Sequence, residues 1–166
     1  RPMTDRVKHS LFDNLHEWFV DATVLDWFSG SGSLGLECLS RGAAKAIFVE
    51  RDRGALRALK QNIADMKCGD RAVVLAIDAY AAAGHPEMRE LTIAFVDPPY
   101  SHAASGHQRH KVDDLLRGLA KDSMVDGGIL SFRHPSGVSI EPGALGVKIV
   151  RELVYGDMAI TWLRKA

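Results

Sequence analysis

The four residues Asp97-Pro98-Pro99-Tyr100 have the types and order needed to bind a flat amine. They follow the apolar run 92–96, which is typical of a buried strand. Proline lacks a backbone N–H, so two consecutive prolines end the strand and stiffen the chain around Asp97 and Tyr100. The Asp97 carboxylate and the Pro98 carbonyl can accept hydrogen bonds from an exocyclic NH2 group, while Tyr100 stacks on the ring. The alternative is a rigid turn with a satisfied aspartate.

A second motif is the segment Gly30-Ser31-Gly32-Ser33-Leu34-Gly35, a G-x-G-x-x-G pattern between a predicted strand and a predicted helix. Its backbone can approach a ligand closely, and the start of the helix offers free N–H groups. Three interpretations are open: a turn without a ligand, a dinucleotide site, and an S-adenosylmethionine site. Asp26 precedes the loop and favours the third, because its buried carboxylate would repel a pyrophosphate and attract an ammonium group or a water. Asp26 could instead cap nearby loop amides.

Two further carboxylates each follow a predicted strand. Glu50 closes one short apolar run, and a carboxylate there can accept hydrogen bonds from both hydroxyls of a ribose. A surface ion pair with Arg51 or Arg53 is the alternative. Asp78 follows the next run and can accept from an adenine amino group or cap a short helix over 79–83, and these two roles are compatible.

The elements that must position these motifs are indicated by hydrophobic periodicity. Strands that alternate with helices indicate an α/β domain with a mainly parallel sheet, and such sheets bind ligands outside the carboxyl ends of their strands. Helices are predicted over 4–20, 33–41 and 52–66 and around 115–119. Strands are predicted over 23–28, 46–49, 73–77, 92–96 and 128–132, with a terminal hairpin over 147–155 and 158–163.

Three histidines follow the proline motif: His102, His107 and His110 lie beside Arg109 and Lys111. No carboxylate or cysteine spacing accompanies them, so the pattern does not indicate a metal site. We expect a mobile, mildly basic loop that closes over a substrate, with a plain solvated loop as the equal alternative.

The chain has 166 residues, 46% hydrophobic and 25% charged, which is typical of one globular domain. This composition excludes a disordered, collagen-like or disulfide-stapled protein. With 21 basic and 21 acidic residues, the zero net charge does not itself indicate nucleic-acid binding. Cys38 and Cys68 form no C-x-x-C pair, and the sequence has no signal peptide and no membrane-spanning apolar run, so we expect a cytoplasmic protein. The chain begins at Arg1 without an initiator Met, and we expect further residues upstream.

The order of these motifs resembles that of class I S-adenosylmethionine-dependent methyltransferases, and the D-P-P-Y form resembles enzymes that methylate an exocyclic amino nitrogen of a base. The segment Arg1-Pro2-Met3-Thr4-Asp5-Arg6-Val7-Lys8 with Leu11-Phe12 is similar to the R-P-T-T-D-R-V-R-E-x-L-F segment of the bacterial small-subunit ribosomal RNA guanine-N2 methyltransferases. Gly35-Leu36-Glu37 and Val49-Glu50 continue the resemblance, which covers nearly the whole chain. Met3 stands where that segment of the family has a Thr.

The resemblance implies a single methyltransferase domain over 1–166 with a class I, Rossmann-like α/β fold. That fold has a seven-stranded, mainly parallel sheet with a terminal antiparallel hairpin and helices on both faces. The implied activity is S-adenosylmethionine-dependent methylation of the N2 amino group of a guanine in small-subunit ribosomal RNA, with the RNA or the small ribosomal subunit as partner. We expect a monomer without metal or membrane contact, and a short RNA-binding segment rich in Gly and Arg upstream of residue 1.

The expected site combines the strand-end residues with those that the resemblance implies. The expected catalytic residues are Asp97, Pro98, Pro99 and Tyr100. The expected S-adenosylmethionine-binding residues are Asp26, Phe28, Ser29, Gly30, Ser31, Gly32, Glu50, Arg51, Asp78, Ala79 and Asp97. The expected RNA-binding residues are Thr4, Arg6, Lys8, Tyr100, Arg109 and Lys111, together with Arg1.

Three other functions are weighed against this one. An adenine-N6 methyltransferase acting on DNA or RNA uses the same D-P-P-Y chemistry, but the segment 4–7 and the lack of a target-recognition domain disfavour it. The glycine motif alone would indicate a dinucleotide-dependent oxidoreductase, which Asp26 and the proline motif disfavour. A non-catalytic RNA-assembly module would not need the intact Asp97 and Tyr100.

Overall fold

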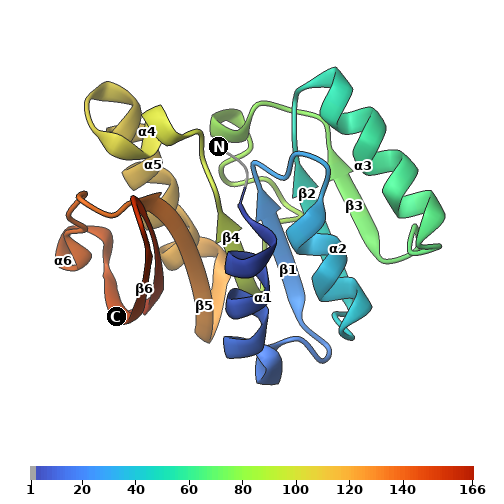
Figure 1. Cartoon of the computed structure of the whole chain (residues 1–166), viewed down its shortest axis with the longest axis horizontal. Coiled ribbons are helices and arrows are strands. Elements are labelled where there is room, and N and C mark those ends of the chain that lie inside the picture. The colour runs from blue at the N-terminus through green and yellow to red at the C-terminus, as the bar shows by residue number, and fades with distance from the viewer. Residues whose placement is uncertain (1–2) are drawn as a thin grey trace.

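The computed structural model describes residues 3–166, so Arg1 and its expected RNA contact lie outside the described residues. A seven-stranded sheet forms the centre of the molecule (Figure 1). Its strands are β1 (Thr23–Trp27), β2 (Lys45–Val49), β3 (Ala72–Leu75), β4 (Leu91–Val96), β5 (Met124–Pro135), β6 (Val147–Tyr155) and β7 (Met158–Lys165). The strand order is β3-β2-β1-β4-β5-β7-β6. The pairs from β3 to β5 are parallel and the last two are antiparallel, so the predicted parallel sheet with a terminal hairpin is confirmed.

Helices cover both faces of the sheet, as predicted (Figure 1). One face carries α1 (Asp5–Asn14), α2 (Ser33–Ser40) and α3 (Arg53–Asp65). The other carries η2 (Ala79–Ala81), α4 (Tyr100–Ala104), α5 (His107–Gly118) and α6 (Pro142–Leu145). Two short elements complete the chain, η1 (His16–Trp18) and η3 (Leu119–Ser123). Among the described residues, no helix is both long enough and apolar enough to cross a bilayer.

The prediction of a loop after the proline motif is wrong. Its residues form α4 and α5, with Gly106 at a φ of 79° between them. The helical spacing of Val112, Leu115 and Leu116 explains the difference, because these side chains bury one face of α5 against the sheet. The predicted helix over 4–20 is likewise interrupted: α1 ends at Asn14, and η1 follows.

Strand register brings the strand ends together. Trp27 of β1 pairs with Val49 of β2 on one side and with Val96 of β4 on the other. Val96 in turn pairs with Phe132 of β5. The residues that follow these positions therefore line up along one edge of the sheet. The indole N–H of Trp27 also donates a 2.9 Å hydrogen bond to the carbonyl of Ala79, which fixes η2 beside that edge.

We predict that Gly35→Ala destabilises the fold by about 1–3 kcal/mol, because the added methyl group overpacks the contact between α2 and the sheet. A Cβ at Gly35 would lie 2.5 Å from the Cε1 atom of Phe48 and 3.2 Å from the Cβ atom of Asp26. Gly118→Ala is the matched control, since Gly118 has a helical φ of −62° and no heavy atom within 4 Å of an added Cβ. We expect the control to be neutral or stabilising by up to about 1 kcal/mol. Denaturant unfolding measures both, and equal losses in the two variants would contradict the packing argument.

Candidate functional site

A cavity of about 410 Å³ opens at the carboxyl ends of the parallel strands. Its volume lies within the range of about 300–1,000 Å³ that is usual for small-molecule sites. Arg133 and Met158, from β5 and β7, complete one wall. Nine residues that the sequence predicts as site residues line this cavity: Phe28, Glu50, Arg51, Asp78, Ala79, Asp97, Pro98, Pro99 and Tyr100.

The proline motif lies between β4 and α4. Pro98 is buried, Pro99 is the N-cap residue of α4, and Tyr100 is the first residue of that helix. The side chain of Asp97 is 23% exposed, whereas Tyr100 is 43% exposed. A carboxylate in the cavity wall and an exposed aromatic ring beside it are the two surfaces that a flat amine needs.

Arg133 holds Asp97 from the neighbouring strand. Its Nη1 atom lies 3.0 Å from Oδ1 and 3.2 Å from Oδ2 of Asp97, and only 10% of the Arg133 side chain is exposed. Burial raises the pKa of Asp97 above its ordinary value, and the Arg133 guanidinium opposes that shift. Sequence reasoning missed Arg133. The signal was present, because Arg133 directly follows the predicted strand 128–132 and so occupies a strand-end position.

Glu50 joins the glycine loop to the end of β2. Its Oε2 atom accepts a 2.9 Å hydrogen bond from the backbone N–H of Gly30, and Oε1 accepts 2.8 Å bonds from the N–H groups of Arg51 and Asp52. The alternative of a surface ion pair is not what the structure shows, because Arg51 pairs with Asp78 at 2.7 Å. Glu50 is thus fixed in orientation and lines the cavity.

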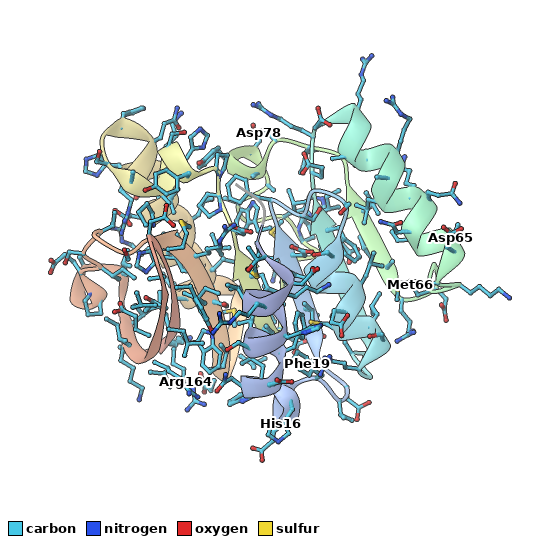
Figure 2. The ribbon with its side chains drawn as sticks, in the orientation of Figure 1. His16, Phe19, Asp65, Met66, Asp78 and Arg164 are labelled. Atoms are coloured by element: carbon cyan, nitrogen blue, oxygen red, sulfur yellow. The ribbon has the colours of Figure 1, made fainter. Side chains whose placement is uncertain are left out.

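Asp78 caps η2 through hydrogen bonds from the backbone N–H groups of Tyr80 and Ala81. In Figure 2 it lies at the end of the molecule opposite His16 and Phe19. The Tyr80 ring packs edge-on against Phe28 at 5.6 Å, and its hydroxyl lies 2.8 Å from Nδ1 of His102. Tyr80 and His102 form an aromatic wall of the cavity that the sequence did not predict. Neither position carries a pattern that could have identified it.

The glycine loop itself lies beside the cavity rather than in its wall. Phe28 has a φ of 66°, a left-handed conformation that costs a bulky residue about 1–3 kcal/mol and is typical of functional sites. Gly30 has a φ of 55°, and an added Cβ there would have no atom within 4 Å. The Oγ atom of Ser29 is buried without a hydrogen-bond partner among the described residues. Ser31 and Gly32, also predicted to bind the cofactor, do not line the cavity either.

Asp26 lies beneath the loop and is 1% exposed. Its Oδ2 atom accepts a 2.9 Å hydrogen bond from the backbone N–H of Gly35, so the loop-capping alternative is the arrangement observed. Asp26 does not line the cavity. The pKa of Asp26 is raised from 3.8 to about 7. Desolvation by burial is the largest cause, the charges of Asp97 and Glu50 act in the same direction, and the hydrogen bond from Gly35 opposes the shift.

Two of the predicted RNA-binding residues line a neighbouring cavity. Thr4 and Arg6 contribute to a cavity of about 490 Å³, which shares Arg133 with the first. Lys8 faces another part of the surface, where it forms a 3.9 Å ion pair with Glu37 of α2. Arg6 and Lys8 therefore lie on different parts of the surface.

The two predicted RNA-binding residues after the proline motif differ in their surroundings. Lys111 is exposed, and its Nζ atom lies 5.7 Å from the centre of the Tyr80 ring, beside the site cavity. Arg109 is buried, and it donates to Asp113 at 2.8 Å and to the carbonyl of Ala103 at 3.0 Å. The expectation that Arg109 faces RNA is corrected accordingly. Its guanidinium instead ties α4 to α5, because a buried cation needs internal acceptors.

The family model "Conserved hypothetical protein 95" matches residues 1–164. The chain belongs to this family. The "Ribosomal RNA small subunit methyltransferase D" of Escherichia coli K12 is 47% identical over 102 residues, which cover 60% of this chain and 50% of the relative. The match thus spans about half the length of that relative. The "Putative rRNA methyltransferase YlbH" of Bacillus subtilis 168 is 32% identical over 168 residues, covering 99% of this chain and 88% of that protein.

Solved structures of methyltransferases share the fold. The "Putative methyltransferase yhhF" from Escherichia coli superposes with a TM-score of 0.83 at 33% identity, covering 100% of this chain and 89% of that chain. An RNA methyltransferase from Salinibacter ruber, in complex with S-adenosyl-L-homocysteine, superposes with a TM-score of 0.69 at 14% identity, covering 98% of this chain and 92% of its own. The class I methyltransferase fold and the resemblance seen in the sequence are both confirmed.

We predict that wild-type stability declines between about pH 4 and about pH 7 relative to Asp26→Asn, by on the order of 2–4 kcal/mol. The pKa of Asp26 is raised from 3.8 to about 7, so the folded state binds the proton more tightly than the unfolded chain. Rising pH across this window therefore lowers the free energy of unfolding of the wild type. Asparagine does not titrate, so this loss is absent in Asp26→Asn. Urea unfolding across the window measures the difference, and parallel pH profiles would contradict it.

Proposed function

We propose that this chain transfers a methyl group from S-adenosylmethionine to the exocyclic N2 amino group of a guanine in small-subunit ribosomal RNA. The observation that carries the proposal is the placement of Asp97 and Tyr100, acceptor and stacking surface, in the wall of a cavity at the strand ends of a methyltransferase fold. Relatives named for ribosomal RNA methylation support the choice of RNA. Such a substrate also favours a cytoplasmic location.

The residues around the cavity fit the proposed cofactor. Glu50 is held in place by three backbone N–H groups. Two of them donate to Oε1 and one donates to Oε2, so Oε2 keeps a lone pair for a ribose hydroxyl. Asp78 stands at the next strand end, where it can accept from an adenine amino group, and the Phe28 and Tyr80 rings offer apolar surface for the base. The unpartnered Oγ atom of Ser29 can donate to a polar group near the glycine loop. When bound, S-adenosylmethionine supplies an electrophilic methyl group.

The target amine is oriented by the proline motif. The lone pair of an exocyclic amine is delocalised into the ring, which makes the nitrogen a poor nucleophile. Asp97 and the Pro98 carbonyl would each accept one N–H bond, favour a more tetrahedral nitrogen and hold it in one position. The nitrogen becomes acidic only as it is alkylated, so no base need act beforehand. Positioning of this kind can contribute up to about 7–11 kcal/mol.

RNA must offer the guanine in an unstacked form. Extruding a base costs a few kcal/mol, and stacking on Tyr100 can recover about 1–3 kcal/mol of that cost. The exposed Lys111 and the cavity lined by Thr4 and Arg6 flank the site on two sides, and we assign them the RNA backbone. The chain has zero net charge, so these local contacts must carry the attraction.

We predict that Glu50→Gln weakens binding of S-adenosylhomocysteine by about 1–3 kcal/mol, because the ribose loses a charged hydrogen-bond acceptor. Glutamine keeps the size of the side chain and one carbonyl oxygen for the loop amides. Glu37→Gln on α2, outside the cavity, is the control and should bind as the wild type does. Isothermal titration calorimetry compares the three proteins, and unchanged affinity in Glu50→Gln would remove Glu50 from the cofactor site.

We predict that the wild-type protein yields N2-methylguanosine and that Asp97→Ala lowers the single-turnover rate by about 100- to 1,000-fold, the scale for losing one positioned polar contact. The protein is incubated with labelled S-adenosylmethionine and with either naked ribosomal RNA or small subunits that lack the modification. Mass spectrometry of the digested nucleosides then identifies the product. N6-methyladenosine would instead establish the adenine alternative, and a wild-type rate in Asp97→Ala would show that Asp97 is only structural.

A further inference from the structure

The parallel register of β4 and β5 creates a pair of opposite charges in the cavity wall. Val96 is paired with Phe132. The residues that follow them, Asp97 and Arg133, are therefore neighbours at the same edge of the sheet. Nη1 of Arg133 contacts both carboxylate oxygens, at 3.0 and 3.2 Å. A charge-assisted contact from one nitrogen to both oxygens holds the carboxylate in place with its two oxygens turned toward β5.

We propose that Arg133 is a positioning residue, which holds Asp97 as an oriented anion toward the amine-binding end of the cavity. The consequence for catalysis rests on the proposed function, whereas the contact itself does not. Both residues line the same cavity, and the Arg133 side chain is only 10% exposed, so water contributes little to the pairing. The proline motif itself contains no cationic residue that could pair with the Asp97 carboxylate.

Within residues 3–166, the other charged and titratable groups around Asp97 do not replace Arg133. Asp26 of β1 interacts unfavourably with Asp97, and Glu50 at the end of β2 is a further carboxylate in the cavity wall. Tyr100 and His102 of α4 line the same cavity, and the His102 ring is hydrogen-bonded to the hydroxyl of Tyr80. Asp78 also lines the cavity, so four carboxylates lie at or near this edge of the sheet. Arg133 bonds directly to the one that must accept the amine.

An ionised Asp97 is what the amine requires. A carboxylate only accepts hydrogen bonds, whereas a protonated carboxyl group donates from one of its oxygens. Each oxygen of the anion uses one lone pair on Arg133 and keeps the other for an N–H group. Loss of the guanidinium would leave a partly buried carboxylate without its main compensation, and such a group takes up a proton at higher pH.

The direct test is the titration of Asp97 in the protein without any ligand. The carboxyl ¹³C resonance of Asp97 is identified by its absence in Asp97→Asn and is followed from acid to neutral pH. We expect Arg133→Met to raise the pKa of Asp97 by about one unit or more, a tenfold change in proton affinity. Arg133→Lys keeps the charge and should retain most of the wild-type titration. Arg151→Met is the control, because Arg151 lies over Trp162 outside the cavity.

The second measurement is the pH dependence of single-turnover methylation. We expect the acid limb in Arg133→Met to move to higher pH by the same amount as the Asp97 titration, with the rate falling more than RNA affinity and with rescue in Arg133→Lys. An unchanged Asp97 titration in folded Arg133→Met overturns the proposal. If Arg133→Met does not fold, an Asp97 titration in Arg133→Lys and Arg133→Gln that fails to follow the side-chain charge overturns it equally. Absence of methylation by the wild type would refute the proposed function, and the titration would still decide the role of Arg133.

Discussion

Five parallel strands end along one edge of the sheet, and the register between them is the constraint on which the site depends. It places Glu50, Phe28, Asp97 and Arg133 one after another along that edge. A slip of one residue between strands would turn these side chains to the opposite face. The register is held by apolar packing on both faces of the sheet, so residues far from the cavity control its geometry.

Three carboxylates near this edge are stabilised in three different ways. Asp26 is fully buried and receives one backbone N–H, which leaves its pKa at about 7. Glu50 receives three backbone N–H groups from the loop and the chain that follows β2. Asp97 accepts a hydrogen bond from the guanidinium of Arg133. The first arrangement anchors the glycine loop, the second keeps a carboxylate fixed and accessible, and the third keeps one oriented. Similar positions after a strand therefore lead to different chemistry, because the donors around them differ.

The cavity has one wall assigned to the cofactor and one assigned to the base, and the proposed reaction must bring these two ligands together. The loop after β3 is tied to β1 by the bond from Trp27 to Ala79 and to α4 by the contact between Tyr80 and His102. Through these contacts, the wall assigned to the cofactor and the wall assigned to the base form one unit.

The seven strands in chain order, the helices α1, α2 and α3, the fold class and most of the cavity wall could be predicted from the sequence alone. These features follow from local signals: hydrophobic period, strand-ending prolines such as Pro98, and carboxylates directly after apolar runs. Three features became known only from the folded structure: Asp26 caps a loop, Arg109 is buried, and Arg133 holds Asp97. The last two residues are 36 positions apart, and their contact exists only through the pairing of β4 with β5. Local patterns specify which residues reach the edge of a sheet, whereas register and burial decide which of them touch.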